Sequence, residues 1–463
     1  MGGHLDEVIA QPKNMIRERI LTGDIWKTVL WLSLPSVATM VLQTANGLID
    51  GLFLGRLGAA ALGGVGLASQ INMILMSIAT AVSVGSTALI ARYVGADDTK
   101  NAERAVRQAI ILSVIISLAS GVLAYAFGPM LIRAMGGRGE GLRLGTVYLN
   151  IVLLGVTPFY LMIILTGVFR GMGDMRTPFW VMVAMTVISI IGDYVLIFGI
   201  GPFPKLGVAG AGIATVISRL VATVMYLAYL PKSHLGRSLR GSWRPSWDWS
   251  RRILSIGSPA AAQGLLRTAA SMTYFAMLGA TAQGIYAIAA LTIGLRTEAL
   301  AFMPGFAFSV AATSMVGQNL GARQPDRAEK GAWAAAWQGV AVMGTVGLLF
   351  IIFARPLASM FTTDPNVLPL AAAYLRINGI SEPFLALAMV LTGALQGAGE
   401  TRLPTVATVV TLWFIRLPLT YYLAITLGLQ STGAWIAMSG SAILGGLATL
   451  AVFKWSNWKD RAI

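Results

Sequence analysis

Three polar side chains recur along one face of the first long apolar segment of the sequence. Gln43, Asn46 and Asp50 are spaced by three and four residues, which places them on one side of a helix. A second acid, Asp193, lies in another apolar segment, with Ser189 four residues earlier on the same helical face. A carboxylate inside a bilayer costs roughly 2.5 to 3.5 kcal/mol on insertion scales, and such residues usually face a cavity or a partner. These residue types therefore indicate a buried site for a proton or a cation.

A purely structural role for the two acids is also open. Away from the ends of the predicted segments, Arg219 is the only other charge inside the amino-terminal membrane segments, and a buried charge is normally paired. One arginine can fully neutralise only one carboxylate. An ion pair also does not explain why Gln43 and Asn46 share a helical face with Asp50, a set that we name the polar stripe. We therefore favour a functional site, with a pair between Arg219 and Asp50 or Asp193 as the alternative.

The composition decides the class of protein that must position these residues. Hydrophobic residues make up 56% of the 463-residue chain and charged residues only 11%, which is not the composition of a water-soluble globule. The net charge of +15 lies between apolar runs, so we expect no nucleic-acid partner. With no cysteine and two histidines, the chain offers little for metal or redox chemistry, and we expect no metal site and no cofactor.

Apolar runs of about 20 residues or more predict membrane-spanning helices. We expect twelve, near residues 26–51, 59–91, 103–127, 142–169, 176–200, 207–230, 250–278, 284–317, 331–354, 366–396, 403–427 and 432–453. Most of the 34 Lys and Arg residues collect in alternate connections; those on the other side are Arg56, Arg133, Arg138, Arg143, Lys205 and Arg355. The positive-inside rule then places both termini in the cytoplasm. The sequence predicts an all-α, multi-pass protein of the plasma membrane.

The longest polar stretch, residues 231–252, divides the predicted helices six and six, and the two halves contain a repeat. GADDTKNAER (95–104) aligns with GARQPDRAEK (321–330), and LTGVFRGMGDMRTP (165–178) aligns with LTGALQGAGETRLP (391–404) at the same offset. An even number of helices in each copy keeps the copies parallel in the membrane. We expect an amino-terminal six-helix lobe at 1–230, a cytoplasmic linker at 231–249 and a carboxyl-terminal six-helix lobe at 250–463.

These motifs together resemble the multidrug and toxic compound extrusion (MATE) transporters over nearly the whole chain. The resemblance rests on Pro35, LQTANGLIDGLFLGRLG (42–58), FRGMGDMRTP (169–178), GDYVLIFG (192–199), GAGIATVIS (210–218) and VGQNLGA (316–322). The first-helix acid and the pair Arg296 and Glu298 are similar to the DNA-damage-inducible branch. The resemblance implies two lobes about a central cleft, and a monomeric antiporter that meets membrane lipid and a small-molecule substrate. No phosphate-binding loop is present, so an ion gradient must supply the energy.

The resemblance also assigns a coupling site in the first lobe. It implies that Asp50 and Asp193 are the two membrane acids, that Thr215 is the family's sixth-helix threonine, and that Tyr148 is its fourth-helix tyrosine. Two carboxylates near one another in a low dielectric should share a proton. Ser189 replaces the family's usual asparagine and removes a cation-coordinating amide, so we favour protons over sodium as the coupling ion. Pro35 in the first helix is expected to act as a hinge.

The charges of the second lobe differ in sign from those of the first. Away from the ends of its predicted helices, the second lobe has four arginines and two glutamates: Arg267, Arg296, Arg376, Arg416, Glu298 and Glu382. Two interpretations of the arginines are open: interhelical ion pairs hold them, or two of them are unpaired and receive an anionic part of the substrate. Arg267 stands about where the sodium-coupled branch carries an acid.

Three classes of function follow from the sequence. The antiporter for organic, drug-like or metabolite substrates is the best supported, and the second-lobe arginines also suit a flippase for a lipid-linked or organic-anion substrate. A membrane-embedded enzyme is the weakest, because Asp97 and Asp98 stand in a loop whose counterpart in the second half lacks them.

Overall fold

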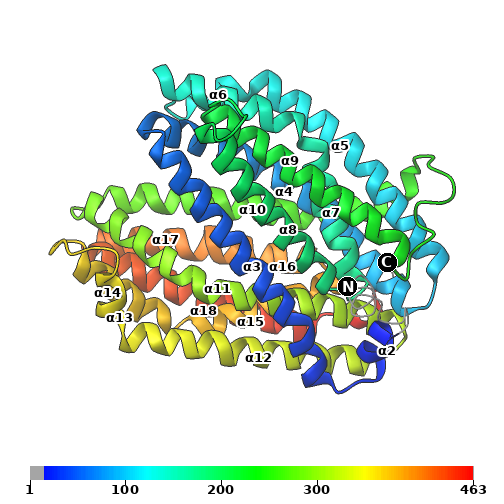
Figure 1. Cartoon of the computed structure of the whole chain (residues 1–463). Coiled ribbons are helices and arrows are strands. Elements are labelled where there is room, and N and C mark those ends of the chain that lie inside the picture. Colours follow the sequence, from blue (N-terminus) through cyan, green and yellow to red (C-terminus); the bar gives the residue numbers. More distant parts are fainter. Residues whose placement is uncertain (1–14, 462–463) are drawn as a thin grey trace. The chain divides into compact units, whose positions relative to one another are not determined.

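The computed structural model describes residues 15–461, and they form helices joined by short connections without a β-strand (Figure 1). Nine of the helices in this range are long and apolar enough to cross a membrane, and two bent helix pairs raise the number to 11. The 33-residue helix α10 (Trp247–Gly279), which carries several charges at its start, completes the twelve predicted from the sequence. Residues 1–14 and 462–463, which are the predicted cytoplasmic termini and belong to the two predicted lobes, lie outside the described residues.

The helices follow the predicted segments closely. In the first half they are α2 (Met15–Thr22), α3 (Ile25–Arg56), α4 (Ala59–Gly95), α5 (Thr99–Ala134), α6 (Gly139–Leu154), α7 (Val156–Gly171), α8 (Arg176–Phe198), α9 (Val208–Tyr229) and η1 (Leu230–Lys232). After α10 they are α11 (Gly284–Gly321), α12 (Pro325–Ile352), α13 (Ala354–Ser359), α14 (Leu368–Gly379), α15 (Glu382–Gly397), α16 (Arg402–Val409), η2 (Val410–Arg416), α17 (Leu417–Thr420), η3 (Tyr421–Thr426), α18 (Gln430–Trp455) and η4 (Trp458–Asp460).

Two segments predicted as single helices are bent in the middle. The chain turns by 59° between α6 and α7 and by 56° between α14 and α15. Pro158 and Pro383 lie in the first turn of the second helix of each pair, where a missing backbone N–H is tolerated. A proline at that position cannot donate to the preceding turn, so each helix restarts in a new direction. In the second half, η2 and η3 are π-helical, which the sequence did not indicate.

Two compact units make up the described chain. The first contains residues 15–18 and 38–258, and the second contains 19–37 and 259–461. The units divide just after Pro35 in α3 and at Pro259 in α10, so both helices contribute residues to each unit. The two six-helix lobes with a linker at 231–249 stay a prediction from the sequence repeat.

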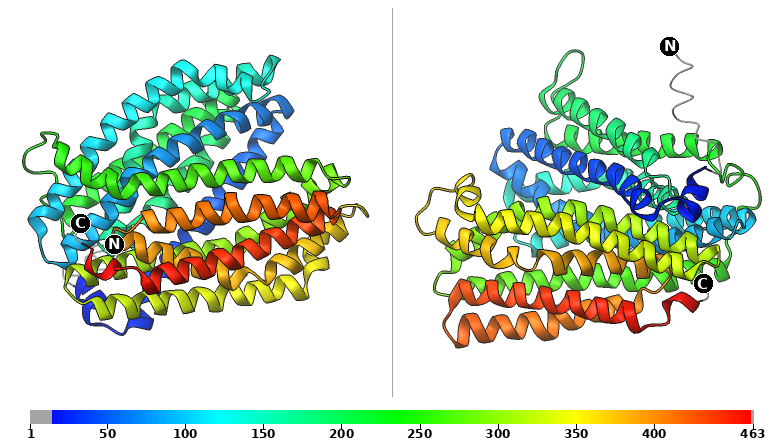
Figure 2. Two further views of the ribbon diagram at one scale, coloured as in Figure 1. Left: turned by 180° about the vertical axis from the view of Figure 1, so that it is seen from behind. Right: turned by 90° about the horizontal axis from the view of Figure 1, so that it is seen from below.

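Close helix packing defines the core of each unit. In the first, α4 packs against α5, α6 and α7, and α8 packs against α9. Gly64 of α4 meets Gly141 and Gly145 of α6, where an added Cβ would collide with the facing backbone. In the second, α11 packs against α12 and α15, and Figure 2 shows α18 (red) running along the orange segment that contains η2 and η3.

The sequence repeat is present in the structure at matching turns. Asp97 and Arg323 both adopt a positive φ, 61° and 58°, between the helices that they connect. Gly173 and Gly399 do the same, with φ of 81° and 80°. These four positions correspond in the alignment of the two halves, so the glycine-rich motifs are explained by turn geometry.

An acid follows each of these glycine turns and caps the next helix. The Asp174 carboxylate accepts hydrogen bonds from the backbone N–H groups of Arg176 and Thr177, each at 3.0 Å. Glu400 accepts in the same way from Arg402 and Leu403, at 2.9 and 3.1 Å. The acids of the GDMRT and GETRL motifs therefore satisfy helix amino termini.

Candidate functional site

The side chains of Asp50 on α3 and Asp193 on α8 lie close enough to interact with each other. Asp193 is only 2% exposed, and Asp50 is half-buried. Two neighbouring carboxyl groups in a low dielectric can share one proton. We name Asp50 and Asp193 the carboxyl pair. The pair is one of the contacts that the sequence predicted, and it lies within the first unit.

Apolar packing one helical turn beyond the acids holds the two helices together. Leu54 is four residues after Asp50, Ile197 is four residues after Asp193, and both belong to one buried cluster. The Phe53 ring adds an edge contact with Phe198, at 5.8 Å between centroids. Since residues four apart share a helical face, this packing directs both carboxyl groups to the same place.

The stripe on α3 becomes more buried towards Asp50. Gln43 is exposed, Asn46 is half-buried, and the Asn46 amide donates a 3.0 Å hydrogen bond to Asp50 Oδ2. Asp50 Oδ1 is buried and has no hydrogen-bond partner among residues 15–461. Ser189 is buried on the same face of α8 as Asp193, and the structure adds Thr186 to that face, three residues earlier. Sequence reasoning missed Thr186, although its spacing gave the signal.

Tyr148 on α6 and Thr215 on α9 lie beside the carboxyl pair. The Thr215 hydroxyl donates to the Ala211 carbonyl at 2.9 Å, and Tyr148 lies close enough to interact with Thr215. Tyr148 interacts electrostatically with both acids. Ala211 belongs to the same buried cluster as Leu54 and Ile197, so the packing that positions the acids also positions Thr215 one turn away.

Arg219 is close enough to act on Asp50 but does not form an ion pair with it. Its guanidinium carbon lies 4.2 Å from the centre of the Phe159 ring, and it interacts with Asp50 electrostatically. Across residues 15–461, none of the ion pairs within 4.0 Å joins Arg219 to an acid. The structural alternative of a buried Arg219 ion pair is thus absent from this conformation. Phe159, which supports the arginine by a cation–π contact, was not anticipated.

The second unit contains a different buried polar cluster. Glu298 on α11 is 5% exposed and accepts a 2.5 Å hydrogen bond from the Tyr374 hydroxyl on α14. Gly294, one turn before Glu298, leaves room for the Tyr374 ring, with which an added Cβ would collide. Arg416 donates to Ser441 at 2.7 Å and interacts electrostatically with Glu298. Sequence reasoning identified Glu298 and Arg416 but missed their tyrosine and serine partners.

The remaining second-unit charges are distributed less compactly. Glu382 is 1% exposed, and neither of its carboxyl oxygens has a hydrogen-bond partner. Arg267, Arg296 and Arg376 are exposed, and none of them forms an ion pair with the described chain. The interpretation that these three arginines are structural ion pairs is therefore wrong for this conformation. Their role in contacting substrate stays a prediction.

The arrangement defines a multi-pass membrane transporter, and comparison with known proteins supports that class. The MatE family model matches residues 35–195 and 259–422, one segment in each half. The chain belongs to the MatE family, whose members are transporters and not enzymes.

Individual relatives cover almost the whole chain. It is 32% identical to a probable multidrug resistance protein NorM of Thermotoga maritima over 95% of this chain and 94% of that protein. It is 30% identical to a FAD transporter of Shewanella oneidensis over 87% and 89% of the two chains. A solved MOP superfamily transporter from Pyrococcus furiosus has the same fold, with a TM-score of 0.87, 24% identity, and coverage of 95% and 98%.

Two substitutions distinguish the two buried glutamates of the second unit. Tyr374→Phe removes the donor to Glu298 and leaves a buried carboxyl group unpaired, so we expect a loss of about 1 to 3 kcal/mol in the free energy of unfolding. Glu382→Gln removes no hydrogen bond, so we expect little change in the free energy of unfolding. Thermal unfolding of the purified variants in detergent measures both. A larger loss for Glu382→Gln than for Tyr374→Phe would contradict this description of the cluster.

Proposed function

We propose that this protein is a secondary antiporter that exports small organic molecules in exchange for protons, with the carboxyl pair as the coupling site. The observation that carries the proposal is that Asp50 and Asp193, from two different helices, lie close enough to interact. Two neighbouring carboxylates in a low dielectric repel each other when both are ionised, so we propose that the pair shares one proton. Loss of that proton creates a repulsion that favours a different conformation.

The surrounding polar groups support proton exchange. Asn46 hydrogen bonds Asp50, and Tyr148 and Thr215 lie beside the pair. Arg219 stabilises negative charge on Asp50 without forming an ion pair that would fix it. Ser189 offers a hydroxyl where an asparagine would offer an amide oxygen, which disfavours sodium as the coupling ion. A sodium-coupled exchange is the alternative within the same site.

The proposed substrates are organic drug-like compounds or metabolites. Relatives are named multidrug resistance proteins, and one is named a FAD transporter, so an anionic organic substrate falls within the range of the relatives. The exposed guanidinium groups of Arg267, Arg296 and Arg376, together with Arg416 and Glu298, are the proposed substrate contacts. Exposed arginines without ion pairs are free to bind a carboxylate or a phosphate.

Pro35 is the proposed hinge that connects protonation to movement. Helix α3 continues through Pro35, but proline removes one backbone hydrogen bond and weakens the helix there. The two compact units divide three residues later, between Val37 and Ala38. Bending at this point would move Asp50 relative to the first part of the helix.

The proposed location is the plasma membrane, with the protein a monomer and both termini in the cytoplasm. The distribution of Lys and Arg between alternate connections supports this orientation. In the proposed orientation, the connection between α9 and α10 lies on the cytoplasmic side.

Replacing each acid by a neutral amide tests the carboxyl pair. Asp50→Asn and Asp193→Asn each remove the charge change with little change in volume, so each should abolish substrate uptake into inverted vesicles driven by an imposed pH gradient. Arg219→Ala should be milder, because it changes the surroundings of Asp50 but leaves the shared proton in place. Folding is checked by size-exclusion chromatography of the purified variants. Transport by Asp50→Asn at the wild-type rate would contradict the proposal.

Removing either the pH gradient or sodium during transport tests which ion is coupled to export. Collapsing the pH gradient with an ionophore should stop export, whereas removing sodium at constant pH should not. Ser189→Asn restores an amide oxygen beside the pair and should increase any dependence on sodium, with Ser189→Ala as the control that removes the hydroxyl. Transport that strictly requires sodium in the wild type would show that the ion is assigned incorrectly, while leaving the site itself in place.

A further inference from the structure

The connection between α9 and α10 is folded onto the start of α5. Arg107 Nη1 donates to the carbonyl oxygens of Ser238 at 3.2 Å and Arg240 at 2.8 Å. Gln108 both donates to the Arg244 carbonyl at 2.8 Å and accepts from the Ser246 N–H at 2.9 Å. These bonds hold the backbone of the connection in one conformation, because they satisfy it at four separate positions.

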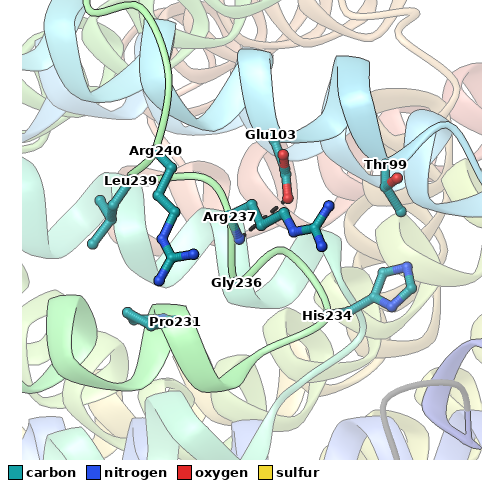
Figure 3. A pocket seen from close by; sticks show the side chains of 8 residues that line it. All are labelled: Thr99, Glu103, Pro231, His234, Gly236, Arg237, Leu239 and Arg240. Carbon is teal, nitrogen blue, oxygen red and sulfur yellow. Dashed lines mark hydrogen bonds between the residues drawn. The ribbon is translucent and has the colours of Figure 1, made fainter.

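This folded connection surrounds a pocket of about 460 Å³. Figure 3 shows Thr99 and Glu103 on the α5 side of the pocket, and His234, Arg237 and Arg240 on the side of the connection. A pocket of this volume is within the range of small-molecule sites and is large enough for a phosphate group with a small substituent. We name it the linker pocket.

The linker pocket contains more positive charge than the protein neutralises. The side chains of Arg237 and Arg240 form no hydrogen bond or ion pair with residues 15–461, and both are exposed. Glu103 is the one acid in the lining, and its Oε1 accepts from the Arg237 backbone N–H at 3.2 Å. Two guanidinium groups therefore line this pocket without a hydrogen bond or ion pair to the described chain, and the planar N–H groups of a guanidinium match the oxygens of a phosphate.

The position of the pocket along the chain places it at the level of lipid headgroups. Helix α9 ends at Tyr229 and α10 begins at Trp247, so the connection lies directly at the ends of two membrane helices. Trp243 is 44% exposed and Trp247 is 78% exposed, and exposed indole rings are enriched at the membrane interface. Basic pockets at this depth attract anionic lipids on the cytoplasmic side.

We propose that the linker pocket binds a phosphate group, and that a phospholipid with a net negative headgroup supplies it. Arg237 and Arg240 bind the phosphate oxygens, and the headgroup substituent occupies the rest of the pocket near Thr99 and Leu239. Lipid binding here stabilises the segment that joins the two halves of the chain. The proposal is independent of the carboxyl pair and of the coupling ion.

The test compares lipid binding by the purified full-length protein and two double variants in native mass spectrometry. Arg237→Gln with Arg240→Gln removes both pocket charges, whereas Arg244→Gln with Arg251→Gln removes two exposed charges outside the lining. At about 1 kcal/mol per arginine, the pocket variant should bind phosphatidylglycerol roughly tenfold or more weakly than the wild type. The control variant should bind it as the wild type does, and phosphatidylcholine should bind weakly to all three.

Competition with soluble phosphate compounds identifies the source of the phosphate. Inorganic phosphate and glycerol phosphate are each added as competitors of phosphatidylglycerol, and weak competition is expected. Strong competition that depends on Arg237 and Arg240 would support phosphate recognition but overturn the assignment to lipid. Equal binding of phosphatidylglycerol by the pocket variant and the wild type, or an equal loss in the control variant, would overturn the site itself.

Discussion

The cost of placing two carboxyl groups side by side in the membrane region governs the rest of this structure. An isolated buried carboxylate is expensive, and two in contact are tolerated only when a proton lies between them. The chain meets this constraint with apolar packing at Leu54 and Ile197 one turn beyond the acids, and with a hydrogen bond from Asn46. Arg219, supported on the Phe159 ring, supplies positive charge at a distance and leaves the proton exchangeable. We propose that this site responds to protonation by changing shape, as an ion-coupled transporter requires.

The two halves of the chain share their turns but not their buried chemistry. The positive-φ residues Asp97 and Arg323 correspond, and Asp174 and Glu400 cap equivalent helices. The buried polar groups do not correspond: the first unit contains the carboxyl pair, whereas the second contains Glu298 with its Tyr374 and Arg416 partners. The repeat therefore preserves the scaffold, while the interior of each copy is free to take a separate role. This separation fits a division between ion coupling and substrate contact.

Local sequence patterns predicted the helices, the repeat and the contact between Asp50 and Asp193, because each depends on spacing along one helix or on the family resemblance. The patterns did not predict the bends at Gly155 and at residues 380–381, although Pro158 and Pro383 gave a signal through their first-turn positions. They also missed partners that come from other helices, such as Phe159 for Arg219 and Tyr374 for Glu298. Contacts between side chains on different helices depend on how the helices pack. Gly294, for example, leaves room for the Tyr374 ring only after α11 and α14 have packed together.

The shared proton is the central claim, and infrared difference spectroscopy of the purified protein measures it directly. A protonated carboxyl group has a stretching band that a carboxylate lacks. We expect that the wild type at neutral pH has such a band from the pair, and that Asp50→Asn and Asp193→Asn each shift or remove it, because each substitution removes one partner of the shared proton. Spectra in which neither substitution changes the protonated-carboxyl region would contradict the account.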